Sequence, residues 1–186
     1  MSVKFMRRTG IPTSGNKYYT KPAYGGWNEC IYSSKQAWTG SVLYNCVSYA
    51  WGRCVEACCT NGYCADLNLT AKQMIEKRVK ANAGDMAFKA PTWATWKNAG
   101  TTPKVGDIIV WGGGSGQWAG YGHVAVVEKV YSSGKVDWSD CTSSYYSSRA
   151  GSGKGYFAYH TNSNLSTCLG SHYTYKGLIR PNVTFR

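Results

Sequence analysis

The sequence predicts a single α+β domain in which helices come first and a run of antiparallel strands follows. Its 186 residues are the length of one domain, because domains typically hold about 100 to 200 residues. Hydrophobic residues make up 43% of the chain and aromatic residues 15%, which is enough to build a core and excludes a disordered polymer. We find no internal repeat, so residues 1–186 are treated as one domain.

Residues 1–40 are rich in Gly, Tyr, Ser, Thr and Pro and keep neither a helical nor a strand period for long. They contain Tyr18, Tyr19, Tyr24 and Trp27, whose rings offer much apolar surface. We therefore interpret this stretch as an ordered arm held by its aromatic residues rather than as a floppy tail.

Two helices are expected in the first half of the chain. Apolar residues recur at spacings of three and four from Cys46 to Cys58, which predicts a helix that begins at or beside Cys46. Thr70 and Gln73 form a capping-box signature before further apolar residues, which predicts a second helix near 70–81. A turn or short helix is expected around Thr92–Lys97.

The second half of the chain has the pattern of β-strands separated by turns. Strands are expected at 106–111, 123–131, 135–140, 156–159 and 173–179. The glycine-rich loop after the first of these lacks the strand-to-helix context of a phosphate-binding loop, so it does not indicate nucleotide binding. Helices followed by antiparallel strands are typical of an α+β domain.

The chain is strongly basic, with 21 Lys and Arg against 9 Asp and Glu and a formal net charge of +12. Such a surface favours polyanions, and nucleic acid, an anionic membrane and the anionic wall polymers of Gram-positive bacteria all fit. No run approaches the ~20 apolar residues of a membrane span. The start, MSVKFMRRTG, lacks the apolar region of a secretory signal. We therefore expect neither a membrane span nor a secretory signal.

Cys46 is the strongest candidate for a nucleophile, because free backbone N–H groups at a helix start favour a thiolate. A histidine that opens a strand far downstream would complete the arrangement of a cysteine hydrolase. Of the three histidines, His123 follows Gly122 and opens an apolar strand. His160 and His172 lie in polar, turn-rich contexts, which leaves His123 as the candidate base.

The predicted hairpin after His123 supplies a carboxylate. With a four-residue loop at 131–134, Val130 pairs with Lys135 and Ala125 with Asp140, so Asp140 shares a face with His123 as its diagonal neighbour. A loop shorter by two residues places the two directly opposite. In either register Asp140 can accept a ring N–H of His123. Glu128 has the opposite parity and is interpreted as a solvated or structurally paired residue.

Four segments together resemble a CHAP domain, the cysteine, histidine-dependent amidohydrolases and peptidases of bacterial and phage cell-wall lysis: YNCVSYAWGR (44–53), TPKVGDIIVW (102–111), GHVAVVEKV (122–130) and YKGLIRP (175–181). The resemblance implies a papain-like fold, with N-terminal helices packed on an antiparallel sheet. It makes Cys46 the nucleophile, His123 the general base and Asp140 the third residue. Thr142 stands where the family often has Asn, and the Asp-rich calcium loop of some phage members is absent from residues 1–45.

The remaining cysteines and the aromatic residues near the predicted site leave alternatives open. Cys54, Cys58, Cys59 and Cys64 could bind zinc, although their spacing matches no common zinc knuckle. They could also form a disulfide, with Cys58 or Cys59 joined to Cys64, or simply pack in the core. A groove for sugar or peptide is expected to be lined by Trp111, Trp118, Tyr121 and Trp138.

These observations predict a peptidoglycan hydrolase of the phage endolysin or virion-associated lysin type, either an N-acetylmuramoyl-L-alanine amidase or an endopeptidase. We expect no cofactor and no metal, and a monomer without a separate wall-binding domain. Its partners would be the peptidoglycan and anionic wall polymers of Gram-positive bacteria, with no nucleic acid and no membrane insertion. The protein would be made in the host cytoplasm and act on the wall after release or as part of a virion.

Two other classes share the composition. A non-catalytic wall-binding module would be basic and aromatic but would not need Cys46, His123 and Asp140 together. A nucleic-acid binder would use the same charge, and a gel-shift assay at physiological salt would reveal it.

Overall fold

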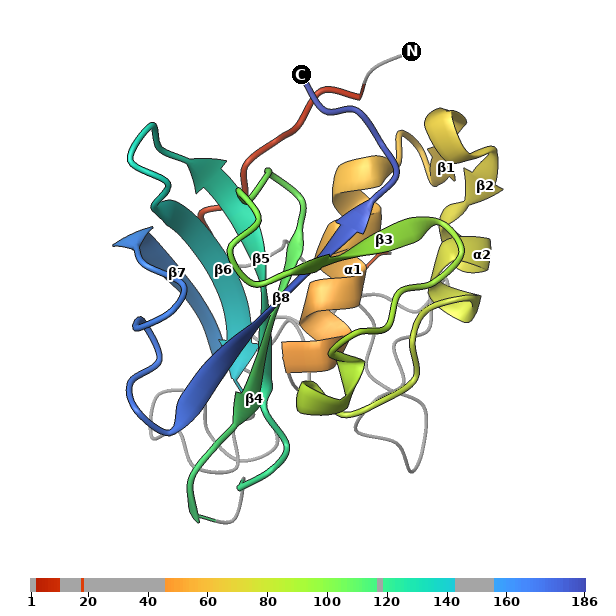
Figure 1. Cartoon of the computed structure of the whole chain (residues 1–186). Coiled ribbons are helices and arrows are strands. Elements are labelled where there is room, and N and C mark those ends of the chain that lie inside the picture. The colour runs from red at the N-terminus through yellow and green to blue at the C-terminus, as the bar shows by residue number, and fades with distance from the viewer. Residues whose placement is uncertain (1–2, 11–17, 19–45, 117–118, 143–155) are drawn as a thin grey trace.

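A six-stranded antiparallel sheet runs through the part of the chain that the computed structural model describes, residues 3–10, 18, 46–116, 119–142 and 156–186 (Figure 1). Every neighbouring pair of strands is antiparallel. With the helices described below, the sheet confirms the α+β class. In spatial order its strands are β3 (Ala94–Asn98), β8 (Tyr173–Pro181), β4 (Ile108–Gly113), β5 (His123–Val130), β6 (Val136–Thr142) and β7 (Tyr156–Ser163).

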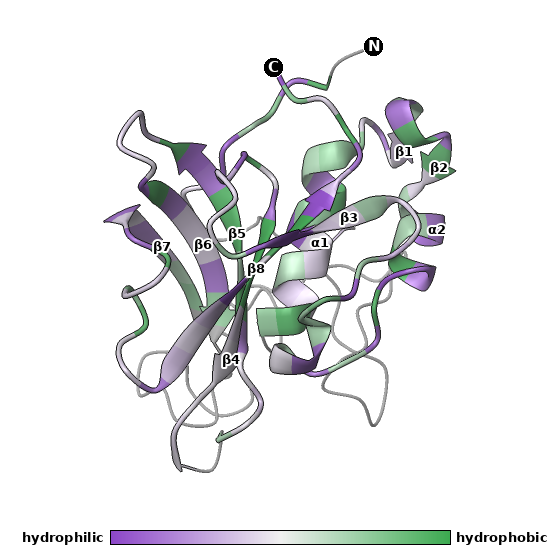
Figure 2. Ribbon diagram, viewed as in Figure 1, coloured by the Kyte–Doolittle hydropathy of each residue, from purple (hydrophilic) through white to green (hydrophobic). Residues whose placement is uncertain are grey.

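Helix α1 (Cys46–Cys58) lies against one face of the sheet, over β5 and β6 (Figure 1). Its apolar residues form one buried cluster with Val124 and Val126 of β5 and with Ile108 of β4. Figure 2 shows these hydrophobic segments on α1 and on the middle strands. The helix expected from the spacing of apolar residues is confirmed, and in the described residues it begins at Cys46.

The expected second helix is present but shorter than predicted, as α2 (Ala71–Glu76). Thr70 and Gln73 form the predicted capping box. The helix ends early because Ile75 O accepts hydrogen bonds from the backbone N–H and the guanidinium of Arg78, which takes the carbonyl that a continuing helix would use. Around it lie β1 (Tyr63–Cys64), β2 (Leu69–Thr70) and the 3₁₀ turns η1 (Ala65–Leu67) and η2 (Gly84–Met86).

The turn or short helix expected around Thr92–Lys97 is wrong, since Ala94–Asn98 forms the edge strand β3. β3 pairs with β8, with Trp96 opposite Ile179. Its partner is some 80 residues away in the sequence, so no local pattern could reveal the strand.

The N-terminal arm contacts the domain at several described points. Val3 forms a parallel bridge with Phe185, and the ring of Phe5 lies 5.2 Å from that of Phe185, edge to face. The hydroxyl of Tyr18 accepts a hydrogen bond from the backbone N–H of Gly62. Tyr19, Tyr24 and Trp27, on which the ordered arm was also predicted, lie outside the described residues. None of the described helices is long and apolar enough to cross a membrane.

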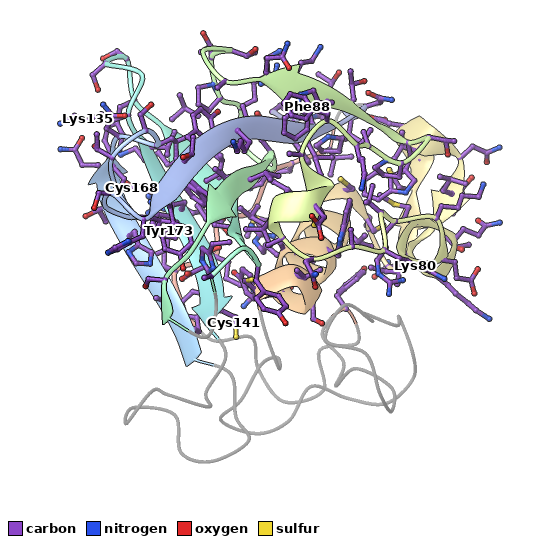
Figure 3. The ribbon with its side chains drawn as sticks, turned by 60° about the horizontal axis from the view of Figure 1, so that its bottom comes forward. Lys80, Phe88, Lys135, Cys141, Cys168 and Tyr173 are labelled. Atoms are coloured by element: carbon purple, nitrogen blue, oxygen red, sulfur yellow. The ribbon has the colours of Figure 1, made fainter. Side chains whose placement is uncertain are left out.

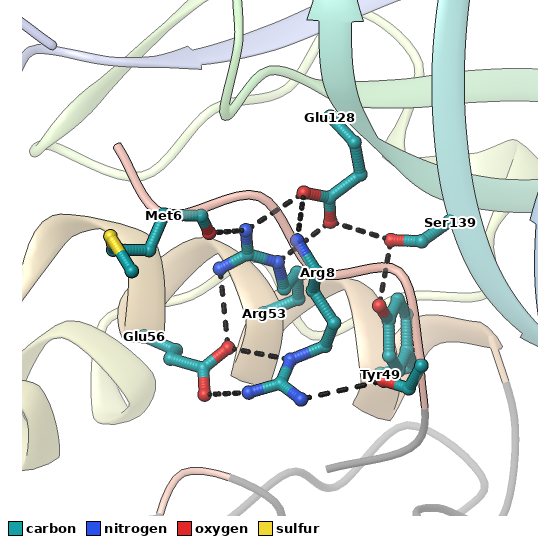
Figure 4. Close-up of polar contacts among 8 residues, drawn as sticks. Met6, Arg8, Tyr49, Arg53, Glu56, Glu128 and Ser139 are labelled. Atoms are coloured by element: carbon teal, nitrogen blue, oxygen red, sulfur yellow. Dashed lines mark hydrogen bonds and ion pairs between the residues drawn. The ribbon is translucent and has the colours of Figure 1, made fainter. Parts of the chain in front are cut away.

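A buried ion pair joins α1 to β5 (Figure 4). Arg53 donates to both carboxylate oxygens of Glu128, at 2.7 and 2.8 Å, and neither side chain is more than 1% exposed. Ser139 donates to the same carboxylate at 2.7 Å and is hydrogen-bonded to the hydroxyl of Tyr49. Glu128 is therefore a structural pair rather than a catalytic acid, as its parity indicated.

The same charges also hold the arm to the domain. The backbone N–H of Arg8 donates to Glu128 at 2.9 Å, and Arg53 donates to the carbonyl of Met6 at 2.6 Å. The guanidinium of Arg8 pairs with Glu56, which also accepts from Arg53 (Figure 4). Two arginines and two carboxylates thus connect three segments that are distant in the sequence.

Replacing one member of the buried pair should destabilise the protein strongly. Arg53→Met keeps most of the side-chain volume but leaves Glu128 buried without its counter-charge, so we expect the free energy of unfolding to fall by about 3–5 kcal/mol. The matched control is Lys72→Met, because the Lys72–Glu76 pair, 3.8 Å apart, is exposed and should cost about 0.5 kcal/mol or less. Urea denaturation of both variants measures the difference, and equal losses would contradict the assigned role of the pair.

Candidate active site

The thiol of Cys46 and the imidazole of His123 meet where two elements begin. Cys46 is the first described residue of α1 and is half-buried, whereas His123 is the first residue of β5 and is 9% exposed. The Cys46 side chain is a hydrogen-bond partner of the His123 ring. The structure thus brings together the two residues that the sequence singled out as nucleophile and base.

Gly122 sets the position of His123. Its φ of +72° lies in the left-handed region, and its N–H donates to Gly113 O at 2.8 Å. A Cβ at this position would lie 2.3 Å from Trp111 O and 2.5 Å from the nitrogen of Gly84. Only glycine fits between these two backbone segments, so the turn that leads into β5 requires glycine at position 122.

Asp140 completes the site from β6. Its Oδ2 lies 2.7 Å from Nε2 of His123, and the residue is 2% exposed. Since an ionised carboxylate only accepts, Nε2 carries the proton and donates, which leaves Nδ1 for Cys46. The predicted diagonal contact between Asp140 and His123 is confirmed.

The strand register nearest the site is the one expected for a four-residue loop, because Val126 lies opposite Ser139 and Val127 opposite Trp138. Nearer the loop the prediction is wrong. Val130 pairs with Val136 instead of Lys135, since a bulge at Glu128 inserts one extra residue in β5.

The environment of His123 favours the charged ring. Burial by itself lowers the pKa of His123, but the charge of the Cys46 thiolate and hydrogen bonds with Asp140 and Cys46 outweigh it and raise the pKa to about 10. The stability contributed by the protonated ring is therefore complete below the unfolded pKa of about 6.5 and is lost as the pH rises toward about 10. The site therefore favours the imidazolium form of His123 beside Cys46.

His160, whose polar, turn-rich context in the sequence does not mark it as a site residue, lies on β7 and contacts the same carboxylate. Its Nε2 is 3.2 Å from Oδ1 of Asp140. Its ring stacks on Trp138, directly opposite it on β6, with ring centroids 3.6 Å apart and planes 12° apart. The alternation of β7 could have signalled this position, but only once the register with β6 was known.

The four aromatic residues expected to line a groove are placed differently. Trp111 and Trp138 are each 1% exposed, so they offer no ring surface to a substrate. Their rings instead stack against those of His123 and His160, respectively. Burial in the sheet's second apolar cluster is the physical reason for this correction. Tyr121 is 49% exposed, and Trp118 lies outside the described residues.

Tyr173, at the start of β8, is an aromatic neighbour of the site that sequence reasoning missed. Its ring lies edge-on to that of His123, with centroids 6.4 Å apart. Figure 3 shows Tyr173 and Cys168 on the same side of the molecule, beside β7 and β8. Thr142, the residue in the position of the family's Asn, ends β6.

The crowded cysteines are packed in the core. Cys54, Cys58, Cys59 and Cys64 are buried thiols, so the structure shows neither proposed disulfide. The pKa of Cys58 is raised by its hydrogen bond with Cys54 and by burial, which favours the neutral thiol. Among the described residues no group of three or more His, Cys, Asp or Glu side chains is arranged to hold a metal ion.

Comparison with known protein families agrees with this arrangement. Residues 35–142, more than half of the chain, match the CHAP domain. The chain belongs to the CHAP family. CHAP domains are generally hydrolases of the cysteine, histidine-dependent amidohydrolase and peptidase type, and the family implies peptidoglycan as the substrate. No curated protein and no solved structure matches this chain.

The glycine before His123 provides a sharp test of how the CHAP site is positioned. Gly122→Ala should destabilise the protein and displace His123, because a Cβ overlaps two backbones in addition to the left-handed strain of about 1–2 kcal/mol. Gly134→Ala is the matched control, since φ is +82° there but nothing lies within 4 Å of the added Cβ. We expect Gly122→Ala to cost at least about 1 kcal/mol more in thermal unfolding, and equal costs would contradict the steric argument.

Proposed function

We propose that this protein cleaves an amide bond of peptidoglycan, with Cys46 as nucleophile, His123 as general base and acid, and Asp140 as the residue that orients His123. One observation carries the proposal: the ring of His123 is hydrogen-bonded to the Cys46 thiol on one side and to the buried Asp140 carboxylate on the other. A purely wall-binding module has no need of this arrangement. The proposed architecture is papain-like, with a nucleophile at a helix start facing a histidine at a strand start.

The proposed reaction proceeds through a thioester. The Cys46 thiolate attacks the amide carbonyl, and the backbone N–H of Cys46 contributes to the site that stabilises the oxyanion. The imidazolium of His123 then donates its proton to the leaving amine as the C–N bond breaks. Water, deprotonated by the neutral ring, hydrolyses the thioester and restores the thiolate and the imidazolium.

The proposed substrate is the wall of a Gram-positive bacterium, and the proposed role is that of a phage endolysin or virion-associated lysin acting as a monomer. The net charge of +12 supports it, because anionic wall polymers attract such a surface. Tyr121 supports it as an exposed ring two residues before His123, where a sugar or peptide could pack. Whether the cleaved bond joins muramic acid to the stem peptide, lies within the stem or lies in a cross-bridge is decided by mass spectrometry of the digested wall, since the new amino termini identify it.

Cys46→Ala should abolish lysis of peptidoglycan while the fold is retained, because no other group replaces the thiolate. Turbidity loss of purified walls measures the activity, and circular dichroism checks the fold. Full lysis by a folded Cys46→Ala protein would overturn the proposal, whereas wall binding without cleavage by the wild type would support the binding-module alternative.

Alkylation by iodoacetamide is a second test of Cys46 as the nucleophile. Iodoacetamide should alkylate Cys46 before Cys168, the other half-buried thiol among the described residues, because burial raises the pKa of Cys168 to about 11. Cys168→Ala is the control and should leave both lysis and the rate of Cys46 alkylation unchanged.

The net charge of +12 predicts that cleavage of two substrates will depend differently on salt. Lysis of whole cells should fall as salt rises from about 0.05 to 0.5 M, since the Debye length shrinks below ~10 Å and recruitment weakens. Cleavage of a small soluble muropeptide should barely change. Equal salt dependence would mean that the charge acts on stability or on the reaction instead of on recruitment.

A further inference from the structure

We propose that His160 is a positioning residue that holds the carboxylate of Asp140 in the orientation in which it accepts a hydrogen bond from His123. This inference rests on the proposed function, because it assigns a role within that site. His160 lies on β7, outside all four segments that carry the family resemblance and outside the matched residues 35–142.

The sheet places a histidine on each side of Asp140. On β7, Ala158 lies directly opposite Asp140, and His160 is two residues further on the same face. On β5, Val126 lies opposite Ser139, so the same register continued by one residue sets Ala125 against Asp140, and His123 is two residues away on that face. Because the directly opposite residues on both sides are alanines, the carboxylate has room to reach the two diagonal histidines.

The two carboxylate oxygens are divided between the two rings. Oδ2 accepts from Nε2 of His123 at 2.7 Å, and Oδ1 accepts from Nε2 of His160 at 3.2 Å. A carboxylate held at one oxygen can still turn about its terminal bond, whereas contacts at both oxygens fix its plane. His160 is itself fixed, since its ring stacks on the buried Trp138.

The second hydrogen bond also keeps Asp140 ionised. Burial raises the pKa of Asp140, but hydrogen bonds from His123 and His160 outweigh it and lower the pKa overall. The charge of Asp140 also acts on Cys168, before β8, whose pKa of about 11 keeps it neutral near pH 7. Cys46 and Asp140 both raise the pKa of His123, which lies between them. Losing His160 would therefore raise the pKa of Asp140, so that on acidification the carboxyl is protonated, and no longer stabilises the imidazolium, at a higher pH.

Two variants separate the hydrogen bond from the ring stacking. His160→Phe keeps a flat ring on Trp138 but has no N–H, whereas His160→Gln loses the ring but retains a donor for Oδ1. We expect His160→Phe to lower kcat on a soluble muropeptide about tenfold with little change in KM. His160→Gln should recover most of that loss, and His172→Phe, at the histidine outside the site, should match the wild type.

The decisive readout is the pH dependence of Cys46 alkylation by iodoacetamide, because it reports on the thiolate and imidazolium without needing peptidoglycan. The midpoint of its acid limb should move to higher pH in His160→Phe and return toward the wild-type value in His160→Gln. Thermal unfolding of each variant is measured in parallel. If the wild type fails to cleave the wall, the proposed function fails while this readout still decides the role of His160.

Three results would overturn the proposal. The first is an unchanged alkylation profile in His160→Phe. The second is equal damage in His160→Phe and His160→Gln, which would place the effect elsewhere than in the hydrogen bond. The third is a fall in melting temperature and activity with no movement of the acid limb, which would make His160 merely structural.

Discussion

The buried pair between Arg53 and Glu128 is the contact on which the geometry of the site depends. Arg53 lies two helical turns after Cys46 on α1, and Glu128 lies five residues after His123 on β5. The ion pair therefore fixes the helix that carries the nucleophile to the strand that carries the base. Because both charges are desolvated, the helix cannot slide along the strand without leaving a buried charge unpaired. Cys46 and His123 are held together by an interaction remote from both.

A second ion pair joins two of the four segments that resemble the family, 102–111 and 175–181. Arg180 donates to both oxygens of Asp107, at 2.9 and 2.7 Å, and so joins the last strand to the turn that precedes β4. Arg180 also donates to Thr102 O, and Lys104 N donates to Asp107. These residues hold β4 and β8 together, and β4 in turn supports β5. The role of the pair between Arg180 and Asp107 is structural, whereas Cys46 and His123 come from the other two segments.

The sequence allowed the elements near the site to be predicted, because each carries a local signal. The helical spacing from Cys46, the capping box at Thr70 and the apolar strand after Gly122 were all sufficient to place their elements. What could not be predicted depends on pairing between distant residues. β3 exists only through β8, the bulge at Glu128 lies in the pairing of β5 with β6, and His160 reaches Asp140 only through the register of β7 with β6. Trp111 and Trp138 were misplaced for the same reason, since parity alone does not say which face of a sheet is covered.

The burial of those two tryptophans gives them a different part in the proposed chemistry. They form a continuous aromatic layer, with ring centroids 5.4 Å apart, and each has a histidine ring stacked on it. Indole rings exclude water from one side of the site, so the hydrogen bonds and charges of His123, Asp140 and His160 act in a medium of low polarity, where they are stronger. The same low polarity makes an unpaired charge costly, which is why each oxygen of Asp140 needs a partner. Burying the tryptophans and bringing two histidines to one carboxylate are therefore parts of a single arrangement.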